Sequence, residues 1–362
     1  MGYNILNSNE FADRLLKWYP ENCRDLPWRE TNDPYIIWLS EIILQQTRVA
    51  QGLPYFNTFL RQFPDVHRLA HAPISQIMRC WQGLGYYSRA RNLHTCAQQI
   101  VSDWNGKFPD SYKDLLSLKG VGPYTAAAIA SFAFGEQVAV VDGNVYRVLA
   151  RYFGLKLDVS THQGKKAFEA LANQLIPASN PGMYNQAIME FGALQCVPRS
   201  PDCPSCPLIG TCHAYATDEV AQLPVKSKKV KVKKRYFTYF HIRCKGYTVI
   251  RERGEGDIWQ GLVDFPLDES NTPGQMDWEI GEQFTKINEF LPKSVEVFDT
   301  SYKHVLSHQM IFATFVQINL SDTDSEYLKE WADRRGYRLA NTNELEALGK
   351  PILIAKYLID CE

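Results

Sequence analysis

The chain has 362 residues and a formal net charge of −1, and 45% of its residues are hydrophobic. This composition is that of a globular protein with two or three cores, and the charge balance excludes nucleic-acid binding through overall positive charge. The sequence contains neither an apolar run of about 18 residues nor a signal-peptide pattern, so we expect a cytoplasmic protein without a membrane anchor. Its nine cysteines favour metal binding over disulfides in that compartment.

Helical periodicity extends from Asn9 to about Ala221. Apolar residues recur three and four positions apart, first at Phe11, Leu15 and Trp18, which is the spacing of one buried helix face. Residues 35–44 and 124–134 repeat the pattern. We therefore expect residues 1–221 to form an all-α region.

Glu41 lies within the apolar segment 35–44, between Trp38 and Ile42. A single acid on such a helix usually faces solvent. If Glu41 faces a cleft instead, its apolar neighbours raise its pKa and keep a proton available near neutral pH. A general acid has this property.

A Gly-x-Gly turn at Gly120 and Gly122 precedes the alanine-rich segment that begins near Pro123. The glycines permit a tight turn and let a phosphate approach the free amides of the following helix. The alternative is a simple turn between packed helices. Farther along, Asp142 precedes Gly-Asn, where it can cap a helix or project into a cleft.

Four cysteines are clustered in residues 196–212, namely Cys196, Cys203, Cys206 and Cys212. A proline-rich loop with four thiolates can surround one metal centre. A structural zinc is the competing interpretation, although zinc loops usually pair two Cys-x-x-Cys units and only one is present here. The spacing also differs from both common ferredoxin patterns.

Seven of the ten residues from Lys226 to Arg235 are basic. This stretch is either a solvated linker or a linker that also contacts phosphates. Short β-rich runs follow at 236–243, 247–250 and 310–318, and helical patterns follow near 278–290 and 325–335. We therefore predict a linker at 222–235 and an α+β domain at 236–362.

The first half resembles the helix-hairpin-helix DNA glycosylases and, among them, the A/G-specific adenine DNA glycosylases. Several motifs occur in the order of that family: Leu26–Arg29, Ser40–Arg48, Trp81–Arg89, Leu118–Thr125, Val141–Arg147 and the four-cysteine loop. The resemblance implies a 4Fe-4S cluster on the four cysteines. It also implies base excision repair by a monofunctional enzyme, a monomer that removes adenine opposite 8-oxoguanine or guanine in double-stranded DNA.

The chemistry assigns a role to each carboxylate, because breaking an N-glycosidic bond needs a proton for the base and an anion beside the sugar. We expect Glu41 to protonate adenine N7 and Asp142 to stabilise the oxocarbenium-like sugar. By resemblance, Tyr124 and Asn144 orient these groups. The resemblance also implies DNA or base contacts by Arg29, Gln46, Thr47 and Tyr86, with Gln46 and Tyr86 filling the gap left by the flipped base.

The second half resembles the Nudix-like domain with which that family recognises 8-oxoguanine. Residues 258–266 match its Leu-x-x-Phe-Pro signature, and Ser307 and His308 match its Phe-Ser-His loop, with Leu306 in place of Phe. The glutamate box of Nudix hydrolases does not follow Pro266, so we predict a binding module and not a hydrolase.

Two other functions fit parts of the sequence. An endonuclease III type of enzyme shares the hairpin and the cluster, but its lyase chemistry needs an amine nucleophile where this chain has Tyr124. A DNA-binding or electron-transfer protein with a cluster and no catalysis is the second alternative. Glu41 and Asp142 in their motifs argue against it.

Overall fold

A computed structural model describes residues 8–227, 232–256, 258–270, 272, 293–306 and 308–361. They form two compact units, one with residues up to 71 and 92–228, the other with residues 72–91 and from 229 onward. The boundary after 228 falls inside the predicted linker, while the helical pattern did not predict the grouping of 72–91 with the C-terminal half. Ser307, Lys228, Lys229, Lys231 and the whole of the predicted helix at 278–290 lie outside the described residues.

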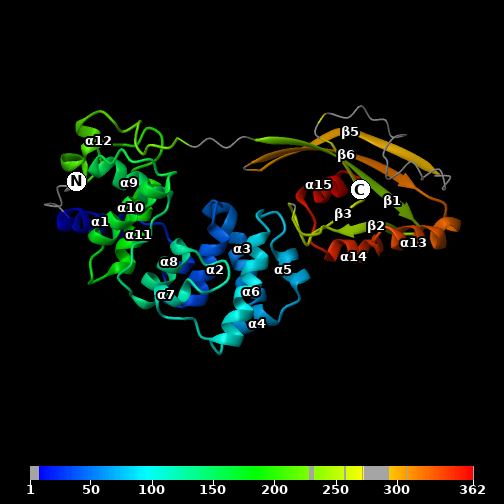
Figure 1. Cartoon of the computed structure of the whole chain (residues 1–362), viewed down its shortest axis with the longest axis horizontal. Coiled ribbons are helices and arrows are strands. Elements are labelled where there is room, and N and C mark those ends of the chain that lie inside the picture. Colours follow the sequence, from blue (N-terminus) through cyan, green and yellow to red (C-terminus); the bar gives the residue numbers. More distant parts are fainter. Residues whose placement is uncertain are drawn as a thin grey trace. The chain divides into compact units, whose positions relative to one another are not determined.

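The first half is helical, as the apolar periodicity predicts (Figure 1, blue to green). None of the described helices has the length and apolar character that a membrane-spanning segment needs. The elements are α1 (Ser8–Asn22), η2 (Pro27–Arg29), α2 (Pro34–Leu44), α3 (Val49–Gln62), α4 (Val66–His71), α5 (Ile74–Cys80), α6 (Ser88–Asp103), α7 (Tyr112–Leu115), α8 (Pro123–Phe134), α9 (Gly143–Phe153), α10 (His162–Leu175), α11 (Pro181–Leu194), η3 (Ile209–Thr211) and α12 (His213–Ala216).

The main core of the first unit lies between α1, α9, α10 and α11. Phe11 and Leu15 of α1 are fully buried there with Leu149 of α9 and Phe168 of α10. Helix α2 is apolar on nearly every side and buries Ile37, Trp38, Leu39, Ile42 and Ile43. A helix that is apolar all round belongs to the interior, so any polar side chain on α2 is also carried inside.

The second unit is built on a mixed seven-stranded sheet, which confirms the predicted α+β class. Its strands are β1 (Lys233–Cys244), β2 (Tyr247–Glu252), β3 (Val263–Asp264), β4 (Leu267–Ser270), β5 (Ser294–Val305), β6 (Gln309–Asn319) and β7 (Arg338–Asn341). The order is β3-β2-β1-β6-β5, with β4 paired to β1 and β7 paired to β2. Strands β1 and β6 are parallel, and the other pairs are antiparallel.

Helices cover both faces of this sheet, because successive strand residues point to opposite sides. Val316 and Ile318 of β6 pack with Trp331 of α13 (Ser325–Arg334). On the opposite face of β6, Phe315 stacks on Tyr357 of α15 (Ile352–Asp360) at a centroid distance of 3.9 Å. The remaining elements are η5 (Asp322–Asp324) and α14 (Thr342–Ala347).

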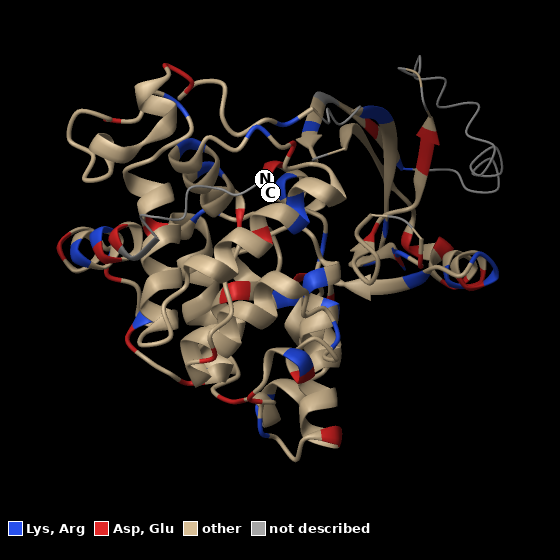
Figure 2. Ribbon diagram, turned by 60° about the vertical axis from the view of Figure 1, so that its left-hand side comes forward, with Lys and Arg blue, Asp and Glu red and all other residues tan. Residues whose placement is uncertain are grey.

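The end of the basic stretch differs from the prediction of a linker. Strand β1 begins at Lys233, and Arg235 is buried and donates hydrogen bonds from Nε and Nη2 to the two Glu269 carboxylate oxygens, at 2.6 Å each. Strand alternation turns Arg235 inward, so its charge is paired within the sheet and not presented to phosphates. Acidic and basic residues are interspersed over the chain (Figure 2).

Candidate active site

A cavity of about 190 Å³ in the first unit, hereafter the catalytic cavity, collects polar side chains from elements far apart in sequence. Four of the predicted site residues besides Glu41 line it: Arg29, Thr47, Tyr124 and Asn144. Apolar side chains such as Trp28, Ile37 and Phe132 complete its wall. Such a lining suits a flat apolar ligand with a few polar edges.

Glu41 lies in the wall of this cavity and is only 8% exposed, because α2 carries it into the interior. Burial raises the pKa of its carboxyl from 4.5 to about 7, the hydrogen bond from Tyr124 opposes the shift, and the charge of Asp142 adds to it. A carboxyl with this pKa carries its proton up to neutral pH. The chemical requirement for a general acid is therefore met at this position.

Asp142 is the N-cap of α9. One carboxylate oxygen accepts hydrogen bonds from the backbone N–H groups of Asn144 and Val145, both at 2.8 Å, and the other accepts one from Asn144 Nδ2 at 2.8 Å. Burial raises the pKa of Asp142, while these hydrogen bonds favour its anionic form. Of the two roles that the sequence left open, the structure shows the helix cap. Asn144 lines the catalytic cavity, whereas Asp142 is not among its lining residues.

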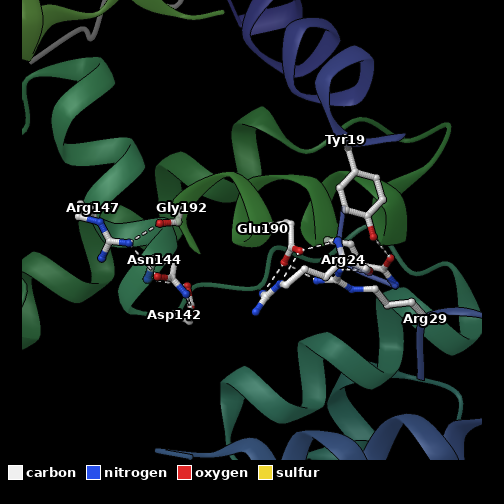
Figure 3. Close-up of polar contacts among 9 residues, drawn as sticks. Tyr19, Arg24, Arg29, Asp142, Asn144, Arg147, Glu190 and Gly192 are labelled. Carbon is white, nitrogen blue, oxygen red and sulfur yellow. Dashed lines mark hydrogen bonds and ion pairs between the residues drawn. The ribbon is translucent and has the colours of Figure 1, made fainter. Parts of the chain in front are cut away.

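Arg147 holds this cap against α11 and the cysteine loop. It donates hydrogen bonds to Asn144 Oδ1 at 2.8 Å, to the Gly192 carbonyl at 2.6 Å and to the Cys196 carbonyl at 2.7 Å. Figure 3 shows the hydrogen bonds of Arg147 to Asn144 and Gly192 beside the labelled Asp142. The position of the carboxylate thus depends on three separate segments of the chain.

Sequence reasoning missed an ion-pair cluster in the same cavity wall. Glu190 of α11 is 1% exposed, accepts hydrogen bonds from Arg24 at 2.7 and 2.8 Å, and pairs with Arg29 at 2.6 Å (Figure 3). Although burial opposes ionisation, the two arginines hold its pKa at about 2. Glu190 follows Ala187 and Ile188 in an apolar helix, which is the same signal that drew attention to Glu41.

The hairpin is present between α7 and α8. Gly120 has a φ of +78°, and a Cβ there would lie 2.7 Å from Asn92, so glycine is required. A Cβ on Gly122 would meet nothing within 4 Å, which leaves open space before that amide. Pro123 is the first residue of α8, so the free N–H groups of the helix start follow directly.

Gln46 and Tyr86 have left-handed backbones, with φ of +55° and +49°. Such a conformation costs about 1–3 kcal/mol in a residue with a side chain and often marks a functional position. Gln46 is exposed directly after α2 in the first unit, and Tyr86 is 42% exposed in the second. That Gln46 and Tyr86 fill the gap left by the flipped base remains a prediction.

Of the four cysteines, Cys196, Cys206 and Cys212 pack against the first core. Burial raises the pKa of Cys206 to about 11, and the other three thiols add to this shift. Arg151 lies 3.4 Å from the Cys196 sulfur. Among the described residues, however, no group of three His, Cys, Asp or Glu side chains has the geometry of a metal site.

In the second unit, His308 is exposed at the start of β6, and its carbonyl accepts a hydrogen bond from Lys233 at 2.9 Å. His308, Leu306 and Trp259 line a cavity of about 200 Å³ that also includes Tyr86 of the 72–91 segment. Leu306 and His308 thus border a cavity with an aromatic wall.

Comparisons with known proteins agree with this arrangement. Residues 39–177 match the HhH-GPD superfamily of base excision DNA repair proteins, and residues 238–360 match the NUDIX domain. An adenine DNA glycosylase of Buchnera aphidicola from Baizongia pistaciae is 31% identical over 96% of this chain and 95% of its own length. The human adenine DNA glycosylase is 41% identical over 61% of this chain and 42% of its own length.

Among solved structures, a thermostable thymine-DNA glycosylase is similar over 60% of this chain and all of its own, with a TM-score of 0.55 and 32% identity. An endonuclease III–DNA complex shares the fold over 59% of this chain and 97% of its own, with a TM-score of 0.51 and 23% identity. The near full-length match to adenine DNA glycosylases, together with the cavity built around Glu41, shows that this chain belongs to the adenine DNA glycosylase family and is a monofunctional DNA glycosylase that removes adenine from double-stranded DNA in base excision repair.

Proposed function

We propose that the protein acts as a monomer on adenine opposite 8-oxoguanine or guanine, with Glu41 as the general acid and Asp142 as the anion beside the sugar. The observation that carries the proposal is the pKa of about 7 at Glu41 within the catalytic cavity. An acid near this pKa donates its proton at neutral pH and accepts it back afterwards.

The reaction follows from these two groups. Glu41 gives its proton to N7 of the flipped adenine while the bond between N9 and the sugar carbon breaks, and the bonding electron pair leaves with the base. The positive charge on the sugar is offset by the Asp142 carboxylate, which its hydrogen bonds keep in one orientation. Water then adds to the sugar carbon and loses a proton.

The catalytic cavity recognises adenine through hydrogen-bonding groups that complement those on the edge of the base. Adenine presents an amine donor next to the N7 acceptor. Glu190 is an anionic acceptor, while Arg29 supplies a donor on the same wall. The energetic cost of extruding the base, a few kcal/mol, is offset in part by Gln46 and Tyr86 filling the space it leaves.

For the cysteine loop we propose a 4Fe-4S cluster held by Cys196, Cys203, Cys206 and Cys212. Four thiols on one loop are a suitable donor set, and Arg151 donates a hydrogen bond to the Cys196 sulfur at 3.4 Å. When bound, such a cluster supplies redox-active iron and ties the loop to the core. Purified protein should contain four iron atoms per chain, as the four-iron cluster type requires; stoichiometric zinc without iron in anaerobic preparations would contradict this.

The second half is proposed to read the lesion through Ser307 and His308. The match to the NUDIX domain and the aromatic cavity beside His308 support this assignment. Base-edge contacts of this kind carry discrimination between partners, whereas phosphate contacts do not.

Two substitutions test the catalytic assignment. Glu41→Gln removes the proton, and Asp142→Asn removes the charge at nearly constant shape. Each should leave duplex binding close to that of the wild type and abolish adenine release under single-turnover conditions. Substantial turnover by Glu41→Gln would remove Glu41 from the role of acid, and binding lost together with activity would assign Asp142 a purely structural role as a cap.

A further inference from the structure

A second, larger cavity of about 710 Å³ adjoins the catalytic cavity within the first unit. The two cavities share Arg24, Leu26, Arg29, Phe132 and Gln186 as wall residues. Because these five residues border both cavities, they are called the partition below. Nothing in the proposed chemistry uses the second cavity.

The second cavity lies at the far end of the helices that frame the site. On α8, Tyr124 at the start of the helix lines the catalytic cavity, whereas Ser131 and Ala133 near its end line the second one. At a rise of about 1.5 Å per residue, Tyr124 and Ala133 are about 14 Å apart along the helix axis. The hairpin proposed to hold DNA immediately precedes α8, so the second cavity opens away from it.

The partition has a fixed part and a part that can turn. Arg24 and Arg29 are held by ion pairs to the buried Glu190. Gln186 is held instead by a neutral hydrogen bond from the Tyr19 hydroxyl, at 2.8 Å, and Tyr19 lines the second cavity itself. A neutral hydrogen bond is weaker than one between charged groups, so rotation of Gln186 opens the partition at the lower cost.

The chemistry of the second cavity suits a neutral purine base. Tyr19 and Phe132 supply aromatic surface, and Asn32, Asn180 and Gln186 supply amide donors and acceptors. Once the glycosidic bond is broken, the base is covered by the duplex on the side from which it entered. We propose that free adenine leaves through this second cavity, past Gln186 and Tyr19, while the enzyme is still bound to the baseless strand; the inference rests on the proposed placement of adenine in the catalytic cavity.

The test obstructs the second cavity and leaves the lining residues of the catalytic cavity unchanged. Ala178 is exposed and lines only the second of the two cavities, so Ala178→Trp places an indole in it. Ala170→Trp, at an exposed alanine of α10 outside the lining of both cavities, is the matched control. Ser179→Trp, at a neighbouring lining residue, replaces Ala178→Trp if the latter fails to melt like the wild type.

Two readouts separate release from cleavage. With tritiated adenine in the duplex, strand scission after alkali reports bond cleavage, and label passing a filter that retains the complex reports release. Ala178→Trp should cleave at the wild-type rate but release the base about tenfold more slowly or worse, while Ala170→Trp should do both normally. Release that keeps pace with cleavage in a folded Ala178→Trp or Ser179→Trp enzyme overturns the proposal.

The second readout needs no catalysis. Free tritiated adenine is added to enzyme already bound to a duplex with a stable abasic-site analogue, and to enzyme without DNA. Ala178→Trp should slow uptake only in the DNA-bound form, where entry from the duplex side is blocked. Equal uptake by the DNA-bound Ala178→Trp and Ala170→Trp enzymes refutes the exit route. A wild-type enzyme that cleaves no adenine refutes the proposed function instead.

Discussion

The burial of Glu41 and the raised pKa of its carboxyl can be inferred only in part from the sequence. A single acid on an apolar helix usually faces solvent, so the sequence left both burial and exposure open. The pKa of Glu41 is raised by its burial and by the charge of Asp142, and both depend on the fold. Glu190 shows the same limit. The sequence shows Glu190 as an acidic residue within an apolar helix. Its partner Arg24 is 166 residues away, so a local pattern could not reveal the pair.

The pKa of Glu41 predicts a pH profile for the chemical step. The acid must be protonated, so the single-turnover rate constant for adenine release should fall above pH 7 by about tenfold per pH unit. Quenched-flow measurements between pH 5 and 9 check this. A rate constant that is flat through this range would show that Glu41 does not deliver the proton.

The free energy of unfolding should also depend on pH through the raised pKa of Glu41. The folded carboxyl retains its proton to about pH 7, whereas the unfolded one loses it near 4.5. Because the folded state binds more protons in this window, the free energy of unfolding decreases as pH rises from 4.5 to 7. Glu41→Gln should lose this part of the pH dependence in urea titrations.

At the scale of elements, the close approach of α11 to α9 positions the Asp142 carboxylate, which we propose to be catalytic. A Cβ on Gly192 would lie 2.7 Å from Asn144 Cβ, so Gly192→Ala must push Asn144 and the cap it forms with Asp142. Overpacking of this kind costs about 1–3 kcal/mol in stability. Adenine release should slow well beyond what the lower melting temperature explains.

Gly254→Ala is the matched control for this prediction, because a Cβ there meets nothing within 4 Å. It should leave both stability and the single-turnover rate near the wild-type values. A Gly192→Ala enzyme with a normal rate would mean that the spacing of α9 and α11 does not set the position of Asp142.

The basic stretch is divided by the start of β1. Lys226 is exposed, whereas Arg235 is buried and paired with Glu269. Lys226→Ala should therefore weaken binding to all duplexes and flatten the salt dependence, and Arg235→Ala should lower the melting temperature with the salt dependence unchanged. Fluorescence anisotropy at several salt concentrations distinguishes them, and an equal loss of salt dependence in both variants would contradict the division.

Local patterns predicted most elements but not how they pair. Helix α2, helix α8 and strand β6 lie where periodicity placed them. The start of β1 at Lys233 was missed, because it depends on a parallel partner 76 residues later, Gln309. Composition marked this segment as basic and solvated, and only the sheet shows that its last residue is buried.

At the scale of the whole molecule, the two halves are predicted to divide the work. A chain ending at Val225 retains Glu41, Asp142, the hairpin and the cysteine loop. It should still release adenine but lose its preference for A opposite 8-oxoguanine over A opposite G, since base-edge contacts are worth about 1–3 kcal/mol each. Ratios of single-turnover rates on the two duplexes measure this.

The full-length comparison for this prediction is Ser307→Ala combined with His308→Ala. That variant keeps the second unit in place and should lose part of the same preference. If the shortened chain kept the full preference for the oxidised lesion, the second half would have some other binding partner.

The central claim is that the intact protein removes adenine because its partner base marks a mispair. The most direct measurement is adenine release by the full chain under single-turnover conditions from two duplexes that differ only in the base opposite adenine, 8-oxoguanine or thymine. The account predicts rapid release opposite 8-oxoguanine and none above background opposite thymine. Equal release from both duplexes, or release from neither, would contradict it.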